Sequence, residues 1–314
     1  MIDFTDKLFL APMAGVSDPV YRQICREMGA DIVLTEMVSA TGLHYGSEKT
    51  ADLARVSPAD RPCGVQLFGA DPDEMGRAVA EIQERFSPDF IDLNAGCPVK
   101  KVVSKNGGAA LLQQEKLFSS IIRAMVRESS VPVTVKIRSG WTKDALVDCL
   151  FGTVAEDAGA ALVTLHPRTR SMGYSGRADW SRIARLKETV SIPVVGNGDI
   201  TTPEEARQMY EETGCDSLML ARGTYGAPWI FSQIRSFLEK GTYTPVSIGQ
   251  RLDMAKYHYT LYEEQYGPRR TLKDMRKHLA WYIKGIPGAT RGRDAIFRAL
   301  TRSEIFASID SLYP

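Results

Sequence analysis

Two glycine-containing segments late in the sequence have the composition of a phosphate-binding site. They are Asn197-Gly198-Asp199 and Ala221-Arg222-Gly223, and each follows a short apolar run. Glycine lets backbone N–H groups approach a phosphate closely, and the Arg222 guanidinium can add a charge-assisted contact. Either segment alone would indicate no more than a turn. Two of them at successive strand ends favour phosphate binding.

Gln66 and Lys136, which lie at the ends of two earlier apolar runs, indicate what carries that phosphate. The phosphate could belong to a sugar phosphate or to flavin mononucleotide (FMN). A flavin ring needs hydrogen bonds along its pyrimidine edge and a cation near N1, where the reduced form carries negative charge. A lysine among buried neighbours needs an anionic or polar partner. These two residues therefore favour FMN, with the Glu36 carboxylate as the alternative partner of Lys136.

Eight short apolar runs must place these residues at one end of a common sheet. The runs are rich in Val, Ile, Leu and Phe without clean alternation, as expected for strands buried on both faces of a parallel sheet. They are Leu8–Met13, Ile32–Met37, Gly64–Phe68, Phe90–Leu93, Val133–Ile137, Leu162–Leu165, Val194–Val195 and Ser217–Leu220. Helical patterns separate them, among them Pro72–Phe86 behind the N-cap Asp71, and Thr202–Glu212, which opens Thr-Pro-Glu-Glu.

Eight strand–helix alternations over about 235 residues predict an α/β protein with a closed (β/α)8 TIM barrel. The competing fold is a doubly wound open sheet. That fold would need a Gly-x-Gly-x-x-Gly turn after an early strand, and the sequence has none. Polar, glycine and cationic residues collect where nearly all the runs end, which is the face where barrel active sites are built.

The strand–helix rhythm stops after about residue 227, and the rest of the chain has helical patterns. Residues 1–240 are thus predicted to form a catalytic barrel and residues 241–314 a small C-terminal helical-bundle domain. The expected elements are a last barrel helix over residues 227–239, a linker over Lys240–Ser247, a helix over Thr271–Lys284 and a single helix from about Arg293 to Ala307.

Charge is distributed unevenly between these parts. The whole chain has a net charge of +1, but residues 267–302 hold ten basic and two acidic residues. A basic module on a mildly acidic body suggests an anionic partner, and a solvated surface is the alternative explanation.

Composition argues against several classes of protein. Residues Met1–Lys7 contain no apolar run, so we expect no signal peptide. The sequence has no stretch of about 18 uncharged apolar residues, so we expect no membrane span. The five cysteines are an odd number without close pairing, which argues against a disulfide framework and against a zinc site. We therefore expect a cytoplasmic protein that has no metal centre, and we expect it to be a monomer.

Six motifs stand out along the chain: Leu10-Ala11-Pro12-Met13-Ala14-Gly15, Gln66-Leu67-Phe68-Gly69, Asp92-Leu93-Asn94-Ala95-Gly96-Cys97-Pro98, Val135-Lys136-Ile137-Arg138, His166-Pro167-Arg168-Thr169-Arg170 and Gly196-Asn197-Gly198-Asp199. Together they resemble the motifs of the bacterial tRNA-dihydrouridine synthases, and most of all those of the branch called the B type. The similarity runs from about residue 8 to past residue 300, and its most specific part is the Asn-x-Gly-Cys-Pro run at residues 94–98. Ala221 is a departure, since relatives often have glycine there, but a backbone N–H survives the change.

The resemblance implies an oxidoreductase that reduces the C5=C6 bond of a D-loop uridine in tRNA, with FMN as cofactor and NADPH or NADH as reductant. Reduced FMN gives a hydride to C6, and a thiol gives a proton to C5 from the opposite face. Cys97 matches that thiol. An ordinary cysteine pKa of about 8.5 leaves the thiol mostly protonated at pH 7, which suits an acid. Its loop also carries Lys100, Lys101 and Lys105, which could fold over a polyanionic substrate.

The resemblance also assigns the remaining site residues. Asn94, Arg138 and Tyr174 match positions near the uracil edge. There Asn94 could read the base and Arg138 could stabilise the charge that develops at O4. The cofactor-binding residues that the resemblance and the loop composition together imply are Pro12, Met13, Ala14, Gln66, Lys136, His166, Asn197, Gly198, Asp199, Ala221 and Arg222.

A tRNA substrate would explain the basic module. The target uridine lies inside a folded tRNA and must be extruded into the pocket. We expect Lys273, Arg276 and Lys277 to hold tRNA phosphates. Two alternatives stay open. One is an FMN barrel that acts on a small pyrimidine, which leaves the basic module unexplained. The other is a tRNA-binding or regulatory protein without enzymatic activity.

Overall fold

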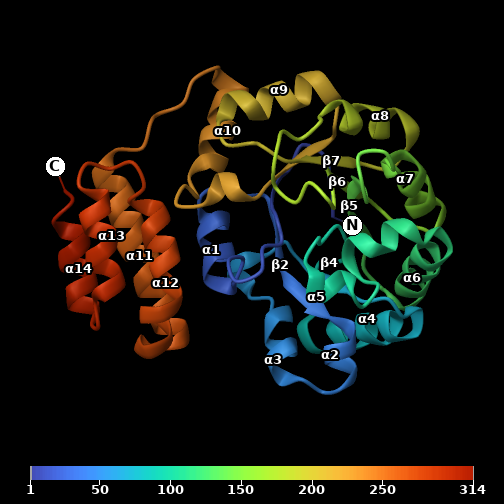
Figure 1. Cartoon of the computed structure of the whole chain (residues 1–314), viewed down its shortest axis with the longest axis horizontal. Helices are drawn as coiled ribbons and strands as arrows, with labels where there is room; N and C mark the ends of the chain where they lie inside the picture. The colour runs from blue at the N-terminus through green and yellow to red at the C-terminus, as the bar shows by residue number, and fades with distance from the viewer. Residues whose placement is uncertain (1, 314) are drawn as a thin grey trace.

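Eight parallel strands close into a barrel, as the sequence predicts (Figure 1). In this computed structural model, which describes residues 2–313, the strands pair in chain order and β8 pairs back with β1. Met1 and Pro314, the outer ends of the two expected domains, lie outside the described residues. The strands are β1 (Leu8–Leu10), β2 (Ile32–Ser39), β3 (Cys63–Phe68), β4 (Phe90–Ala95), β5 (Val133–Gly140), β6 (Val163–Thr169), β7 (Val194–Asn197) and β8 (Ser217–Leu220).

Helices surround the barrel on its outer face (Figure 1). The helices of this ring and its loops are α1 (Pro19–Glu27), α2 (Ala40–His44), α3 (Glu48–Ala51), α4 (Pro72–Phe86), α5 (Lys100–Val103), α6 (Glu115–Glu128), α7 (Asp148–Asp157), α8 (Ser181–Thr189), α9 (Pro203–Thr213) and α10 (Ile230–Lys240). Short 3₁₀ turns are η1 (Asp52–Ala54), η2 (Pro58–Asp60), η3 (Gly108–Gln113) and η4 (Arg222–Thr224).

Local capping chemistry sets the ends of the two ring helices that the sequence predicts best. The Asp71 carboxylate accepts a hydrogen bond from the Glu74 backbone N–H at 2.9 Å, and Pro72 occupies the first turn of α4. Thr202 caps α9 in a reciprocal capping box with Glu205. A side chain at either cap satisfies backbone N–H groups that have no partner inside the helix. Both predicted starts are confirmed.

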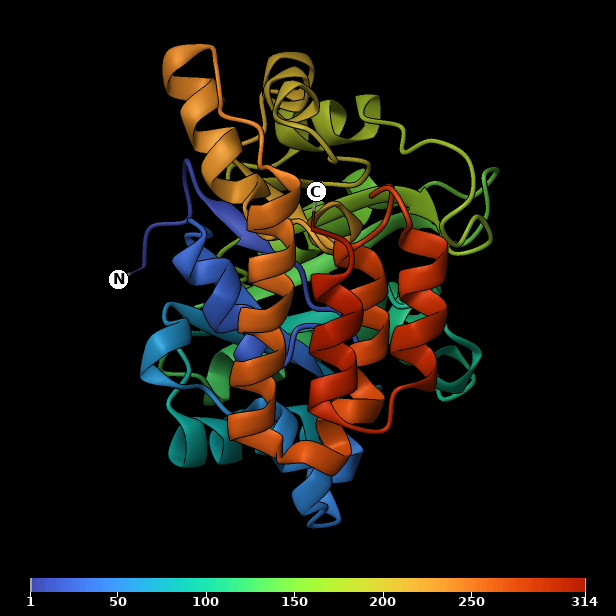
Figure 2. The same ribbon diagram turned by 90° about the vertical axis from the view of Figure 1, so that its left-hand side faces the viewer.

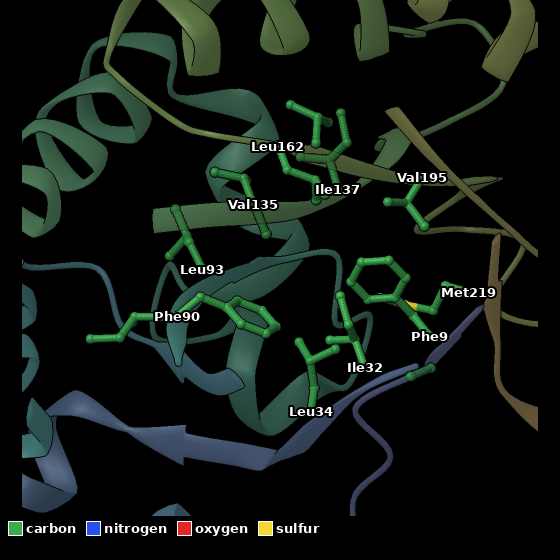
Figure 3. Close-up of a cluster of buried hydrophobic side chains, with 14 of the residues drawn as sticks. Phe9, Ile32, Leu34, Phe90, Leu93, Val135, Ile137, Leu162, Val195 and Met219 are labelled. Carbon is green, nitrogen blue, oxygen red and sulfur yellow. The ribbon is translucent and has the colours of Figure 1, made fainter. Parts of the chain in front are cut away.

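Apolar side chains from the strands form the barrel core (Figure 3). Phe9, Phe90 and Met219 come from three different strands and are all buried. The packing leaves no room for a side chain at Gly64, where a Cβ atom would lie 2.2 Å from the Phe90 ring. Close packing of this kind fixes the strand ends in space, and the strand ends carry the polar residues discussed below.

Four further helices form a bundle on one side of the barrel (Figures 1 and 2). They are α11 (Ile248–Tyr266), α12 (Pro268–Tyr282), α13 (Ala289–Arg298) and α14 (Arg302–Asp310). Their buried apolar residues, such as Tyr259 and Leu279, form one cluster that also contains Val20 and Ile24 of α1. The bundle therefore packs directly on a barrel helix.

The single helix expected from about Arg293 to Ala307 is wrong. The structure has two helices there, because α13 ends at Arg298 and α14 begins at Arg302. The Thr301 hydroxyl accepts a hydrogen bond from the Glu304 N–H at 3.2 Å, and the Glu304 carboxylate accepts one from the Leu300 N–H at 2.7 Å. This capping arrangement starts a new helix. Within residues 2–313, α13 and α14 included, no helix is long and apolar enough to cross a membrane.

Candidate active site

Two adjoining pockets open where the barrel strands end. The first, here called the thiol pocket, has a volume of about 230 Å³ and is lined by Cys97, Asn94 and Arg138 among others. The second, called the glycine-loop pocket, has a volume of about 490 Å³ and is lined by both glycine segments. Residues shared by the two pockets are Pro12, Met13, Lys136, His166, Tyr174 and Tyr225. The structure thus brings together most of the predicted cofactor and substrate residues.

Asn94 shapes the turn that presents Cys97. Its side-chain oxygen accepts hydrogen bonds from the backbone N–H groups of Gly96 at 3.1 Å and Cys97 at 2.9 Å. Gly108 packs behind this turn with a φ of +59°, and a Cβ atom there would lie 2.8 Å from the Cys97 carbonyl oxygen. Partial burial raises the pKa of the Cys97 thiol above its ordinary value. The thiol is therefore protonated at neutral pH, as an acid must be.

A buried chain of polar groups continues from Asn94 into the barrel. The Asn94 amide donates to Gln66 Oε1 at 2.8 Å, and Gln66 Nε2 donates to the Asp92 carboxylate at 2.7 Å. The Thr134 hydroxyl donates to the other Asp92 oxygen at 2.6 Å. Burial raises the pKa of Asp92 to about 6, although Thr134 and Gln66 oppose the shift. Sequence reasoning missed Asp92 as part of this site.

Gln66 lies beneath the pockets rather than on their walls. It is fully buried, both atoms of its amide have partners within the barrel, and it lines neither pocket. In this arrangement it supports Asn94. Its expected contact with a flavin ring stays a prediction.

Lys136 has Asn197 as its partner. Its ammonium group donates to Asn197 Oδ1 at 2.8 Å, while the Asn197 amide donates to the Met219 carbonyl at 2.7 Å. Glu36, the alternative partner considered from the sequence, instead accepts from the Gly15 N–H. Burial lowers the pKa of Lys136 to about 7, with a contribution from the Arg138 charge, while Asp92 opposes the shift. A cation destabilised in this way is favoured again when an anion binds beside it.

Arg138 is held in the wall of the thiol pocket by backbone carbonyls. Its Nε donates to Gly96 at 2.8 Å, and its Nη1 donates to Thr169 at 3.0 Å and Gly173 at 2.7 Å. The guanidinium lies 5.4 Å from the centre of the Tyr174 ring. Arg138 is nearly fully buried, and burial lowers its pKa. Its positive charge is therefore fixed in orientation and poorly screened.

Tyr174 and His166 form the wall between the pockets. Tyr174 is 57% exposed, its ring stacks on His166, and Arg222 lies 4.8 Å from the ring centre. Burial, together with nearby cations including Lys136, lowers the pKa of His166 well below its ordinary value. His166 is therefore a neutral imidazole at physiological pH.

The two glycine segments pack so closely that their backbones line the pocket. Gly198 has a φ of +126°, and a Cβ atom there would lie 2.9 Å from the His166 ring. At Gly223 a Cβ atom would lie 2.2 Å from the Ile200 carbonyl oxygen. Glycine is required at both positions, because a Cβ atom would collide with neighbouring protein atoms.

Asp199 is the one carboxylate among the described residues lining these two pockets. It accepts from Arg168 at 2.7 Å, and Arg222 lies 3.4 Å away. Burial alone would raise the pKa of Asp199, but the hydrogen bond from Arg168 and the two arginine charges lower it. Sequence reasoning left Arg168, which is buried, out of the site. The lining is thus predominantly cationic, and it fits the phosphate and the anionic ring of a reduced flavin.

The three basic residues assigned to tRNA phosphates have different surroundings. Arg276 donates to the Ala299 carbonyl at 3.1 Å, and Lys277 donates to the Gly15 carbonyl. Lys273 is exposed and lines a groove of about 900 Å³ between barrel residues and the α11–α12 turn, here called the interface groove. Its other basic lining residues are Arg22, Lys49, Arg55, Arg269 and Arg270.

Other reactive groups are dispersed. The five cysteines are free thiols. Within residues 2–313, no group of three or more His, Cys, Asp or Glu side chains is placed to hold a metal ion. Cys97 is the cysteine that lines a pocket at the barrel mouth.

A family model and individual relatives of the chain both indicate the same family. A family model described as dihydrouridine synthase (Dus) matches residues 9–311. The chain is 39% identical over 289 residues to tRNA-dihydrouridine synthase B of Pseudomonas aeruginosa, covering 92% of this chain and 87% of that one. It is also 39% identical over 299 residues to the protein of the same name from Pasteurella multocida, with 94% and 89% covered.

Solved structures share the fold at low sequence identity. Histamine dehydrogenase from Rhizobium sp. 4-9 superposes with a TM-score of 0.52 at 14% identity over 81% of this chain. 6-Hydroxypseudooxynicotine amine oxidase from Pseudomonas geniculata N1 superposes with a TM-score of 0.55 at 16% identity over 77% of this chain. The match spans about half the length of each of those chains, 48% and 49%. At such identities the likeness concerns the barrel architecture alone.

Proposed function

The chain belongs to the dihydrouridine synthase family, and from this premise we propose that it reduces the C5=C6 bond of a D-loop uridine in tRNA. The proposal includes FMN as the bound flavin and NADPH or NADH as the electron donor. One observation carries it. A protonated thiol, Cys97, and three basic side chains, Lys136, Arg138 and Arg222, line two pockets that share a wall.

The glycine-loop pocket would hold the cofactor. The backbones of Gly198 and Gly223 and the side chain of Arg222 would bind the phosphate of FMN. Lys136 would lie at the flavin ring, with Asn197 fixing its ammonium group. When bound, reduced FMN would supply the hydride that reaches C6 of the uracil ring.

The thiol pocket would hold the uracil ring. Cys97 gives its proton to C5, so its S–H bond breaks as the C5–H bond forms, and the thiolate then regains a proton from solvent. Asn94 holds the backbone of this acid in place through its two hydrogen bonds. Arg138, oriented by three carbonyls, stabilises the charge that develops at O4 during the reaction. Tyr174 offers an exposed ring at the entrance, on which a base can stack.

Phosphates of the tRNA would bind along the interface groove. The exposed residues Lys273 and Arg269 come from the bundle, and Lys49 and Arg55 come from the barrel. Glu36 also lines this groove, and it accepts from Gly15, whose neighbour Ala14 lines the thiol pocket. A contact between Glu36 and Gly15 thus connects the groove to the loop that carries Ala14, and we propose that the extruded nucleotide passes over this loop. We assign flavin binding mainly to residues 1–240 and tRNA binding mainly to residues 241–314, in a cytoplasmic monomer.

Incubation of the purified full-length protein with NADPH or NADH and an unmodified tRNA transcript tests this function. Dihydrouridine in the digested tRNA, detected by mass spectrometry, is expected from the protein, and over the same time the Cys97→Ala control should form it at least about a hundredfold more slowly. Free uridine and orotate, which both have a C5=C6 bond to reduce, serve as competing small molecules. Turnover of a small pyrimidine without any change in the tRNA would replace the proposal with the small-molecule alternative.

A further inference from the structure

Helix α12 of the bundle contacts the loop that follows β8. The Trp281 ring stacks on the Tyr225 ring, with the ring centres 4.0 Å apart and the planes 12° apart. Tyr225 lines both the thiol pocket and the glycine-loop pocket. The bundle therefore reaches the pocket wall through a single layer of side chains.

The backbone of α12 supports the same loop. Gly226 has a φ of +65°, and a Cβ atom there would lie 2.4 Å from the Trp281 carbonyl carbon. Two residues earlier, the Thr224 carbonyl accepts from the Tyr21 hydroxyl of α1 at 2.5 Å. The loop that carries Arg222 is thus held between α1 and α12.

Lys277 connects α12 to a second loop of the pocket. Its ammonium group donates to the Gly15 carbonyl, and Gly15 has a φ of +71°. Gly15 directly follows Pro12, Met13 and Ala14, which line the thiol pocket. One helix therefore contacts the loops after both β1 and β8, which are neighbouring strands in the closed barrel.

The contact between α12 and the barrel is tightly packed. Tyr21, His258, His278 and Tyr282 are all buried and lie ring against ring. Burial lowers the pKa of His258 to about 3 and that of His278 well below its ordinary value, with smaller contributions from neighbouring cations. Both rings are neutral at physiological pH, so no charge on either histidine disturbs this packing there.

We infer that α12 is a positioning element of the cofactor pocket, in which Trp281 holds Tyr225 and Lys277 holds the Gly15 loop. The inference rests on the proposed function and extends it. Lys273 and Lys277 lie one helical turn apart, yet Lys273 faces the interface groove and Lys277 supports the pocket. The bundle thus contributes to flavin binding as well as to tRNA binding.

Titration of the flavin-free full-length protein with FMN, followed by flavin fluorescence, tests the inference. Trp281→Ala should weaken FMN binding about two- to tenfold, which is the range for loss of one aromatic pair. Trp281→Phe keeps a ring against Tyr225 and should restore most of the affinity. The visible circular dichroism of bound FMN should change in Trp281→Ala, because the wall beside the ring has moved. Phe297→Ala, at an exposed position on α13, is the matched control and should leave FMN binding unchanged.

A second pair of variants keeps the test decisive if Trp281→Ala does not fold. Lys277→Met should weaken FMN binding and leave the salt dependence of tRNA binding unchanged. Lys273→Ala should instead leave FMN binding unchanged and reduce the salt dependence of tRNA binding. Wild-type FMN affinity together with an unaltered dichroism spectrum in Trp281→Ala and in Lys277→Met would overturn the inference. A wild-type protein that binds no FMN would instead overturn the proposed function.

Discussion

The barrel mouth and helix α12 both carry several basic residues, but the two regions use them differently. At the mouth, Lys136 and Arg138 are largely enclosed, and burial lowers the pKa of both. On α12, Arg276 and Lys277 donate to carbonyl groups of other segments, while Lys273 is exposed. Both regions use basic residues for structural contacts, but only those of the mouth also line the two pockets, where we propose that they meet an anionic ligand.

The two regions differ in the free-energy cost of keeping a positive charge there when no ligand is bound. A buried charge is costly unless an anion or a strong dipole compensates it, so the positive charges at the mouth favour the binding of an anion. An exposed lysine on a helix has little such cost, and its contact with a phosphate would contribute a small, salt-sensitive share of the binding free energy. Substitutions at the mouth should therefore change cofactor binding and chemistry strongly, and those on the exposed helix face should change tRNA binding weakly.

The largest effect is expected at Cys97. Cys97→Ala should bind FMN, accept electrons from NADPH and bind tRNA as the wild type does. The oxidation of reduced flavin by tRNA should slow by about 10²–10⁴-fold, the usual contribution of a general acid. Cys97→Ser should recover little, since a hydroxyl is a far weaker acid. Stopped-flow absorbance measures the two half-reactions separately, and equal slowing of both would indicate a structural role.

Arg222 should have the next largest effect. Arg222→Ala should weaken FMN binding about tenfold, the low end for a hydrogen bond to a charged group, because the side chain is 45% exposed and already near Asp199. Arg77→Ala, at an exposed position on α4, is a control with the same change of charge. Equal FMN affinities of the two variants in equilibrium titration would remove Arg222 from the phosphate site.

Lys136 should make flavin reduction depend on pH. In the ligand-free pocket the pKa of Lys136 is about 7, and an anionic flavin bound beside it should raise that pKa. As the pH rises through the raised pKa, Lys136 loses the charge that would stabilise reduced flavin, so the rate of reduction by NADPH should fall. Lys136→Met should show a lower rate with a flatter profile over the same range. A parallel fall in both proteins would assign the titration to another group.

The smallest effect is expected at Lys273. Lys273→Ala should reduce the slope of the logarithm of tRNA affinity against the logarithm of salt concentration by about one. Affinity at moderate salt should fall about threefold. Lys116→Ala, at an exposed position on α6 on the far side of the barrel from the bundle, should change neither (Figure 1). Filter binding over a series of salt concentrations measures both, and identical slopes would place the phosphate contacts elsewhere.

The sequence allows the barrel to be predicted because each element has its own local signal. The helix Pro72–Phe86 matches α4 at both ends, since Asp71 caps its start and Ser87, with a φ of +46°, ends it. The division between α13 and α14 had a local signal too, the Thr301-x-x-Glu304 pattern, which sequence reasoning overlooked. Such features depend on neighbours in the chain and can be found without a structure.

The rest of the site depends on contacts between distant segments. Gln66 pairs in register with Asp92 on the adjoining strand, so its partner could be inferred only with the strand alignment known. The bond from Lys277 to Gly15 joins residues 262 positions apart, and composition alone placed Lys277 with the exposed basic residues. Whether a basic residue binds a ligand or another part of the fold depends on tertiary packing, which no local pattern shows.

The measurement that tests the central claim most directly is a single turnover of the wild-type protein without oxygen. The bound flavin is reduced with one equivalent of NADPH and mixed with an excess of unmodified tRNA. The flavin should be reoxidised, with one dihydrouridine formed for each flavin oxidised. Free uridine at the same concentration should leave the flavin reduced. A flavin that stays reduced with tRNA but is reoxidised by the free pyrimidine would contradict the account.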